Sequence, residues 1–400
     1  MGCFFGGMWY NVHIMKKSPN VLILANPVPT ARYAGVARFA REHGWCLTLE
    51  DPQFPPADWE GDGVIVMLSA ENEALADAVQ RYRRKKMPVV DMMLARADIS
   101  LPRVTSDNEA VGKLAAEHFG DRAFTNLAWY SAKWSPVEEA RYESFAKNAR
   151  RASPDKWVWS DAGKPIAGIG DGRLRWIEAK LKKVGKPVGV FCQSDYDAMC
   201  VLKACQSAGL SVPEDVAILG CDDSEMICEN QTVALSSVRD DHAEIGYEAA
   251  ALLQRLMNGE KAPSKPKLIE PLGVTTRKST DIIAAKDPIL RNALAFIGDN
   301  FGKPMSASKI AKAVGTTRIR LDKAFAAELG RSPGAEVMRR RLARARYLLT
   351  DTDTKVIAIA SQTGFCNAPY LIRSFKKVFG ASPSVWRRRE ENAKKNRIGF

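Results

Sequence analysis

Polar side chains that could hold a small molecule stand directly after several apolar runs of this sequence. Four residues share this position: Asn26, Asp107, Asp195 and Asp222. Carboxylate and amide groups that converge on one place can exchange paired hydrogen bonds with vicinal hydroxyls. Each residue taken singly is more typical of a helix N-cap. Together they predict a site for a neutral polyol.

Residues that would support catalysis or metal binding form no such pattern. The four histidines show no His-Glu-x-x-His spacing. The eight cysteines contain no Cys-x-x-Cys pair, and several fall in apolar runs, which is typical of buried thiols in a reducing compartment. We therefore expect no enzyme activity, no cofactor and no bound metal. The alternative is an α/β sugar-processing enzyme fused to a DNA-binding domain.

The C-terminal part contains an internal duplication. A Gly-x-Ser-Pro segment that begins at Gly330 recurs at Gly380, fifty residues later. Each copy predicts a helix, a turn and a second helix. The predicted helices are Ala307–Val314 and Arg318–Glu328, then Val356–Thr363 and Ala368–Phe379, with Glu336–Leu349 joining the two copies. Their predicted cores are built from Ile310, Ala311, Leu321, Phe325, Ile359, Ala360, Leu371 and Phe375.

The excess positive charge of the chain is concentrated in the same part. Residues 286–400 hold 24 Lys and Arg against 9 Asp and Glu, net +15, which leaves 35 against 37 in the remainder. Two helix-turn-helix units in so basic a segment favour binding to duplex DNA, because each recognition helix fits one major groove. A helical protein-interaction module is the alternative.

Six exposed positions on the two recognition helices are candidates for DNA contact. They are Arg318, Arg320, Lys323, Asn367, Tyr370 and Arg373. Arg320 could read guanine edges with two hydrogen bonds, whereas Arg373 could equally bind phosphate.

The elements that position the four polar residues alternate along the first 260 residues or so. Apolar runs predict strands at Val21–Asn26, Trp45–Glu50, Gly63–Leu68, Pro88–Met92, Arg103–Ser106, Asn126–Tyr130, Gly189–Cys192, Val216–Gly220 and Ala234–Val238. Helical spacing appears in Thr30–His43, Asn72–Arg83, Glu109–Phe119, Pro136–Ala149, Gly172–Lys183, Tyr196–Ala208 and His242–Met257. This order predicts an α/β fold of two doubly wound subdomains, with ligands bound outside the carboxyl ends of the strands.

Several motifs of this front part resemble the effector domains of the LacI/GalR regulators, which share the periplasmic sugar-binding fold. They are Asp107-Asn108-x-x-x-Gly112, Arg141-x-x-x-Phe145, Ser194-Asp195-x-x-Ala198 and the segment from Ala208-Gly209 through Val212-Pro213 to Asp222. The resemblance implies that Arg141, Asp195 and Asp222 contact a sugar. Asp107 and Asn26 are weaker candidates.

Residues 287–389 resemble the AraC/XylS-type DNA-binding domain. The pattern runs from Ile359-Ala360 through Gly364-Phe365 and Tyr370-Leu371 to Gly380-x-Ser382-Pro383. That family has phenylalanine where Leu371 stands and tyrosine where Trp386 stands, and both departures keep an apolar residue. By resemblance, Arg318, Arg320, Asn367 and Arg373 carry the family's phosphate and base contacts.

The pairing of the two resembles the xylose-responsive activators, from about residue 19 to the end of the second domain. It implies a cytoplasmic regulator, dimeric through its sensor, which binds operator DNA and a pentose, and which could contact RNA polymerase at its promoters.

The expected sensor covers 19–281, the linker 282–290, the DNA-binding domain 291–390 and a basic tail 391–400. Residues 1–18 are expected to be a disordered or non-native extension, with Met15 as an alternative start. No run is long and apolar enough to span a membrane, and the lack of an export signal opposes a secreted sugar-binding component.

Overall fold

The structure is a computed structural model of the chain, and it describes residues 18–25, 30–149, 152–160 and 170–388. Asn26, nearly all of the predicted N-terminal extension and all of the predicted basic tail lie outside these residues. Within them, no helix combines the length and the apolar character that crossing a membrane would need.

The first lobe is built on a parallel sheet in the order β2-β1-β3-β4. Its strands are β1 (Asn20–Leu24), β2 (Cys46–Glu50), β3 (Gly63–Val66) and β4 (Val89–Asp91). The helices α1 (Thr30–His43), α2 (Glu73–Arg84) and α8 (His242–Met257) cover it. The two backbones of α1 and α8 touch at Gly246, where a Cβ atom would lie 1.9 Å from the carbonyl oxygen of Arg32. This close packing fixes the N-terminal turns of both helices relative to each other.

The second lobe is built on a sheet in the order β12-β10-β9-β8-β6-β7, in which only the edge strand β12 (Gly273–Thr275) is antiparallel to its neighbour. The other strands are β6 (Asn126–Ser131), β7 (Asp155–Val158), β8 (Val188–Cys192), β9 (Val216–Cys221) and β10 (Ser236–Arg239). Helices α3 (Asn108–Gly120) and α4 (Pro136–Asn148) pack on one face, and α5 (Asp171–Lys183) and α6 (Asp195–Ser207) on the other. The short helix α7 (Glu225–Cys228) follows β9.

The chain passes between the lobes at a two-stranded parallel pair, β5 (Val104–Ser106) with β11 (Lys267–Ile269), and again between β10 and α8. The short 3-10 helix η2 (Lys278–Thr280) ends the second lobe. Residues that follow β5 and β10 therefore lie where the two lobes meet.

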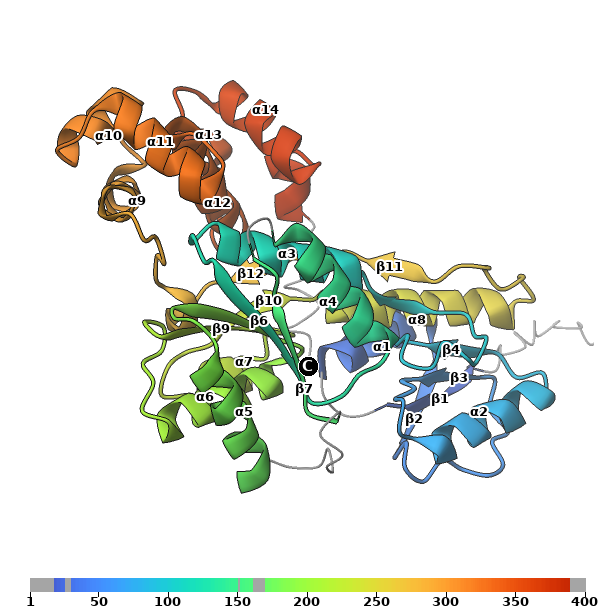
Figure 1. Cartoon of the computed structure of the whole chain (residues 1–400). Coiled ribbons are helices and arrows are strands. Elements are labelled where there is room, and N and C mark those ends of the chain that lie inside the picture. Colours follow the sequence, from blue (N-terminus) through green and yellow to red (C-terminus); the bar gives the residue numbers. More distant parts are fainter. Residues whose placement is uncertain (1–17, 26–29, 150–151, 161–169, 389–400) are drawn as a thin grey trace, which may run out of the picture.

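The C-terminal domain is entirely helical in its described residues (Figure 1). It consists of α9 (Pro288–Asn300), α10 (Ala307–Ala313), α11 (Arg318–Leu329), α12 (Pro333–Asp351), α13 (Val356–Gln362) and α14 (Ala368–Phe379). One core joins α9, α10, α11 and the start of α12, and another joins the rest of α12 with α13 and α14. Helix α12 thus spans both helix-turn-helix units.

The structure confirms the predicted fold class, and each predicted helix and strand corresponds to an observed one within a few residues. All eight predicted core residues of the C-terminal units are buried. No predicted element corresponds to β7, α7, β11, β12, η2 or α9. Helix α9 begins at Pro288, inside the segment expected to be a linker, and its buried Leu290, Ala293, Leu294 and Ile297 have ordinary helical spacing.

Candidate functional site

Arg141 is the centre of the polar groups at the junction of the lobes. It extends from α4 and is buried, yet its guanidinium donates to four acceptors: Asn108 Oδ1 at 2.8 Å, the Gln193 carbonyl at 3.0 Å, Asp240 Oδ2 at 3.1 Å and Cys221 Sγ at 3.3 Å. Burial by itself lowers the pKa of Arg141, but the adjacent Cys221, Asp240 and Asp222 raise it further than burial lowers it. The guanidinium is therefore a fixed cation with its donors already aimed.

Two acceptor oxygens beside this cation have no donor in the part of the chain that the structure describes. Asp240 uses Oδ2 to accept from Arg141 and from Ser106 Oγ at 2.9 Å. Its Oδ1 atom and the Oε1 atom of Gln193 are buried, and neither accepts a hydrogen bond from any residue that the structure describes. A buried acceptor left in this state costs about 1–3 kcal/mol. The two oxygens can accept from a bound molecule that carries hydroxyl groups.

A chain of hydrogen bonds connects the first lobe to Asp222. Arg32 on α1 donates to His242 Nδ1 at 3.2 Å and to the Met92 carbonyl at 2.9 Å. Because Nδ1 accepts, Nε2 of His242 carries the proton, and it lies 3.2 Å from Asp222 Oδ1. Asp222 has a φ of 108°, a conformation that is strained for a residue with a side chain. Backbone strain of this kind is concentrated at functional sites in proteins.

Asp195 lies next to this group, but both of its oxygens are engaged. Oδ1 accepts from Ser237 Oγ at 2.6 Å, and Oδ2 accepts from the Ser224 backbone N–H at 2.7 Å. Burial and the nearby Asp222 raise the pKa of Asp195 to about 8. Gly220 permits this packing, since a Cβ atom there would lie 2.2 Å from Asp195 Oδ1. Asp195 supports the loop that carries Asp222.

Of the residues predicted from sequence, Arg141 and Asp222 are brought together, with Asp195 behind them. Asp107 accepts from the Ala110 backbone N–H at 2.9 Å and is the N-cap of α3, so its oxygen caps a helix. Asp240 was not among the predicted residues, although it follows a predicted strand just as the other candidates do. Gln193, His242 and Arg32 at the junction were not predicted either, whereas Asn108 was identified only as part of the Asp107-Asn108 motif. We call Arg141, Asn108, Gln193, Asp222, Asp240 and His242 the Arg141 cluster.

The second candidate surface is formed by the N-terminal turns of α11 and α14. Thr317 and Asn367 cap these helices by accepting from the backbone N–H groups of Arg320 and Tyr370. Each cap fixes the first residues of its recognition helix directly after the turn of the helix-turn-helix unit. In these turns Gly315 and Gly364 have positive φ values of 69° and 77°.

All six predicted DNA-contact residues are exposed. Among the described residues, Arg320, Lys323 and Arg373 have no carboxylate partner, whereas Arg318 lies 3.6 Å from Asp322. Asn367 uses its oxygen in the cap, which leaves its amide N–H groups to donate. These side chains can supply donors and positive charge to phosphates and base edges.

Several arginine side chains on α12 and just before it are directed at acceptors within the protein. Arg331, Arg339 and Arg340 pair with the buried Glu336, and Arg341 donates to the Phe301 carbonyl at 2.8 Å. The net +15 of the segment therefore overstates the charge that is free to attract nucleic acid.

Comparisons with known proteins match both parts of the chain. Residues 116–280 match the periplasmic binding protein-like domain, and residues 310–389 match a helix-turn-helix domain. The xylose operon regulatory protein of Escherichia coli K12 is 27% identical over 351 residues, covering 82% of this chain and 84% of that protein. Its counterpart in Haemophilus influenzae is 27% identical over 298 residues, covering 72% of this chain and 74% of that protein.

Solved structures show the same fold. That of the xylose-binding transcription activator XylR has a TM-score of 0.55 at 23% identity, covering 93% of this chain and 98% of that one. The transcriptional regulator CelR, solved with cellobiose, has a TM-score of 0.51 at 20% identity, covering 65% of this chain and 84% of that one.

Proposed function

We propose that this chain binds a pentose at the Arg141 cluster and changes its affinity for DNA in response. The chain is a DNA-binding transcription regulator rather than an enzyme, and it joins a periplasmic-binding-protein-like sensor to an AraC-type helix-turn-helix domain. D-xylose is the first candidate, because two relatives that match most of the chain are named as xylose operon regulators.

One observation carries the proposal of a sugar. The Asp240 Oδ1 and Gln193 Oε1 atoms need donors that no described residue supplies, while Arg141 makes four hydrogen bonds with its five N–H groups and so keeps one donor beside them. A polyol provides donor and acceptor on each hydroxyl, so it satisfies both kinds of group at once. A carboxylate or phosphate group would present only acceptors to these two oxygens, and an apolar ligand would leave them unpaired.

The DNA-binding half of the proposal rests on the exposed cations and capped helices of α11 and α14. We propose that the six residues Arg318, Arg320, Lys323, Asn367, Tyr370 and Arg373 contact operator DNA. The regulator is proposed to act in the cytoplasm as a dimer joined through its sensor, and as an activator that could contact RNA polymerase. The proposed domains are the sensor at 19–281 and the DNA-binding domain at 291–390, with α9 entering the segment between them.

The test is a thermal-shift panel on the full chain with D-xylose, L-arabinose, D-ribose, D-glucose and D-glucuronate. A ligand that binds only the folded state at 100 times its Kd adds about 2.7 kcal/mol to the free energy of unfolding. We expect a shift with at least one pentose and none with the uronate. The sugar that shifts the protein is then titrated against DNA selected by the wild-type chain from random duplexes. No shift with any neutral sugar would refute the sensor half of the proposal, and no selected DNA would refute the other half.

A further inference from the structure

Helix α3 touches the Arg141 cluster at one end and the DNA-binding domain at the other. Its first residue, Asn108, accepts from Arg141 Nε at 2.8 Å. The residue that caps its C-terminus, Asp121, forms an ion pair with Arg331 Nη1 at 3.0 Å, and its Oδ2 atom accepts from Arg339 Nη1 at 2.8 Å. Thirteen helical residues separate these ends by roughly 20 Å. A single rigid element therefore spans the distance from the Arg141 cluster to the DNA-binding domain, which we call the reader.

The N-terminal half of α3 is locked to α4, the helix that carries Arg141. A Cβ atom on Gly112 would lie 2.2 Å from the Arg141 carbonyl oxygen, so the two backbones are in direct contact there. Ser144 Oγ also donates to the Glu109 carbonyl at 2.6 Å. A displacement of Arg141 on ligand binding is thus passed to α3 instead of being absorbed between the helices.

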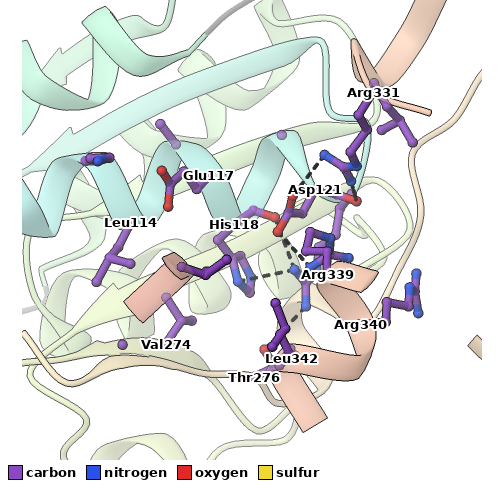
Figure 2. Close-up of a pocket in the computed structure, with 18 of the residues that line it drawn as sticks. Leu114, Glu117, His118, Asp121, Val274, Thr276, Arg331, Arg339, Arg340 and Leu342 are labelled. Atoms are coloured by element: carbon purple, nitrogen blue, oxygen red, sulfur yellow. Dashed lines mark hydrogen bonds and ion pairs between the residues drawn. The ribbon is translucent and has the colours of Figure 1, made fainter. Parts of the chain in front are cut away.

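The reader contacts the end of α3 through Arg331 and Arg339, and these two arginines are themselves held in place. Glu336 on α12 is fully buried and accepts from Arg331 at 2.8 Å and from Arg339 at 2.8 Å. Burial by itself raises the pKa of Glu336, but Arg339 and Arg331 lower it to about 2, so the carboxylate is charged. Figure 2 shows both arginines directed toward Asp121 at the end of α3. An open cleft of about 1780 Å³ lies along this contact.

Arg331 occupies a sensitive place in the reader. It lies between Gly330, which ends α11, and Ser332, which caps α12. A displacement of Arg331 would therefore act on the turn that sets the angle between α11 and α12.

We propose that α3 transmits the state of the Arg141 cluster to the DNA-binding domain, and that Asp121 is the positioning residue through which it does so. The inference rests on the proposed function, since it assigns the route by which a bound sugar alters DNA binding. It predicts that Asp121 governs the coupling between the two ligands and not the affinity for either one alone.

The first experiment measures that coupling in the full chain. The Kd for the selected duplex is measured with and without saturating D-xylose, or another pentose if the panel identifies one, for the wild type, Asp121→Asn and the control Asp98→Asn. Asp98 is exposed and pairs with Arg96 at 2.9 Å on the first lobe, so the control also removes an ion-paired carboxylate. We expect Asp121→Asn to reduce the sugar-induced change in Kd at least fivefold, while each separate affinity stays within about threefold, since coupling is typically 5-fold to 150-fold. Full coupling in Asp121→Asn would overturn the inference while leaving the proposed function intact.

A second experiment needs no sugar. Hydrogen exchange of backbone amides 330–336 is compared in the wild type, Asp121→Asn and Arg141→Lys. Both variants are expected to exchange faster in this segment, Arg141→Lys because its effect travels along α3. If Arg141→Lys left these amides unchanged, α3 would not be the connection, whatever the outcome of the sugar panel.

A double-mutant cycle separates a specific contact from general loosening. Asp121→Ala and Arg339→Ala should be non-additive in the free energy of coupling. Asp121→Ala and Arg341→Ala should be additive, because Arg341 donates to the carbonyls of Phe301 and Lys303, which both lie within the reader. Additivity in both cycles would contradict the inference.

Discussion

His242 Nε2 lies 3.2 Å from Asp222 Oδ1 and thereby ties the first turn of α8, in one lobe, to the loop after β9, in the other. The same ring accepts from Arg32, so the contact has one orientation only. A ligand that binds Asp222 must either keep this contact or replace it, which makes Asp222 sensitive to how the lobes approach each other.

Replacement of Asp222 by alanine should abolish the sugar-dependent thermal shift while non-specific DNA binding persists. Asp222 lies beside Arg141 in the Arg141 cluster, whereas the recognition helices belong to the cores of the C-terminal domain. Differential scanning fluorimetry and gel-shift titration measure the two properties. Asp215→Ala, at the opposite end of β9, is the matched control. Loss of sugar and DNA binding together would contradict the separation of roles.

Asp240→Asn keeps the shape of the side chain but removes the charge that faces Arg141. Breaking one partner of a buried ion pair costs about 3–5 kcal/mol, so the free energy of unfolding in urea should fall. Sugar affinity, measured by calorimetry, should fall at least tenfold, because hydrogen bonds to charged groups contribute about 1.5–3 kcal/mol. Unchanged sugar affinity in a folded variant would remove Asp240 from the binding site.

Arg373→Ala should lower the slope of log K against log salt for DNA binding by about one unit if Arg373 contacts a phosphate. Arg373 is exposed and has no carboxylate partner among the described residues. Fluorescence anisotropy over a range of salt concentrations gives the slope. The control is Arg84→Ala on α2 of the sensor, which removes the same charge far from the reader. An unchanged slope would reassign Arg373 to another role.

Glu336→Gln should destabilise the protein at neutral pH and flatten its loss of stability in acid. The pKa of Glu336 is lowered to about 2 in the folded state, although burial opposes this, because Arg339 and Arg331 hold the carboxylate charged. The stabilisation is therefore present above the ordinary pKa of 4.5 and is lost as the pH falls toward 2. Thermal unfolding from pH 7 to pH 3 measures it. Identical pH profiles for Glu336→Gln and the wild type would show that Glu336 contributes nothing of this kind.

The fold was largely predictable because the apolar periodicity that defines each element is local. Repeated glycines such as Gly330 and Gly380 predict the end of a helix by themselves, since glycine readily adopts the positive φ that both residues have there. The sensor site was predictable only in part. Asp107 and Asp240 both follow strands, and nothing in their neighbourhoods tells that one caps a helix while the other faces Arg141, 99 residues away in the chain. Short edge strands such as Gly273–Thr275 depend on a partner strand and not on their own composition.

The arginines around Glu336 also bear on how the protein finds its target in a genome. Because they donate to protein oxygens, the reader presents fewer free cations to the sugar-phosphate backbone than its composition implies. Fewer released counterions mean weaker retention on irrelevant chromosomal sequence. Molecules of such a protein would therefore spend less time bound to non-specific DNA. Occupancy of the correct promoter would then depend more on base contacts and less on protein abundance.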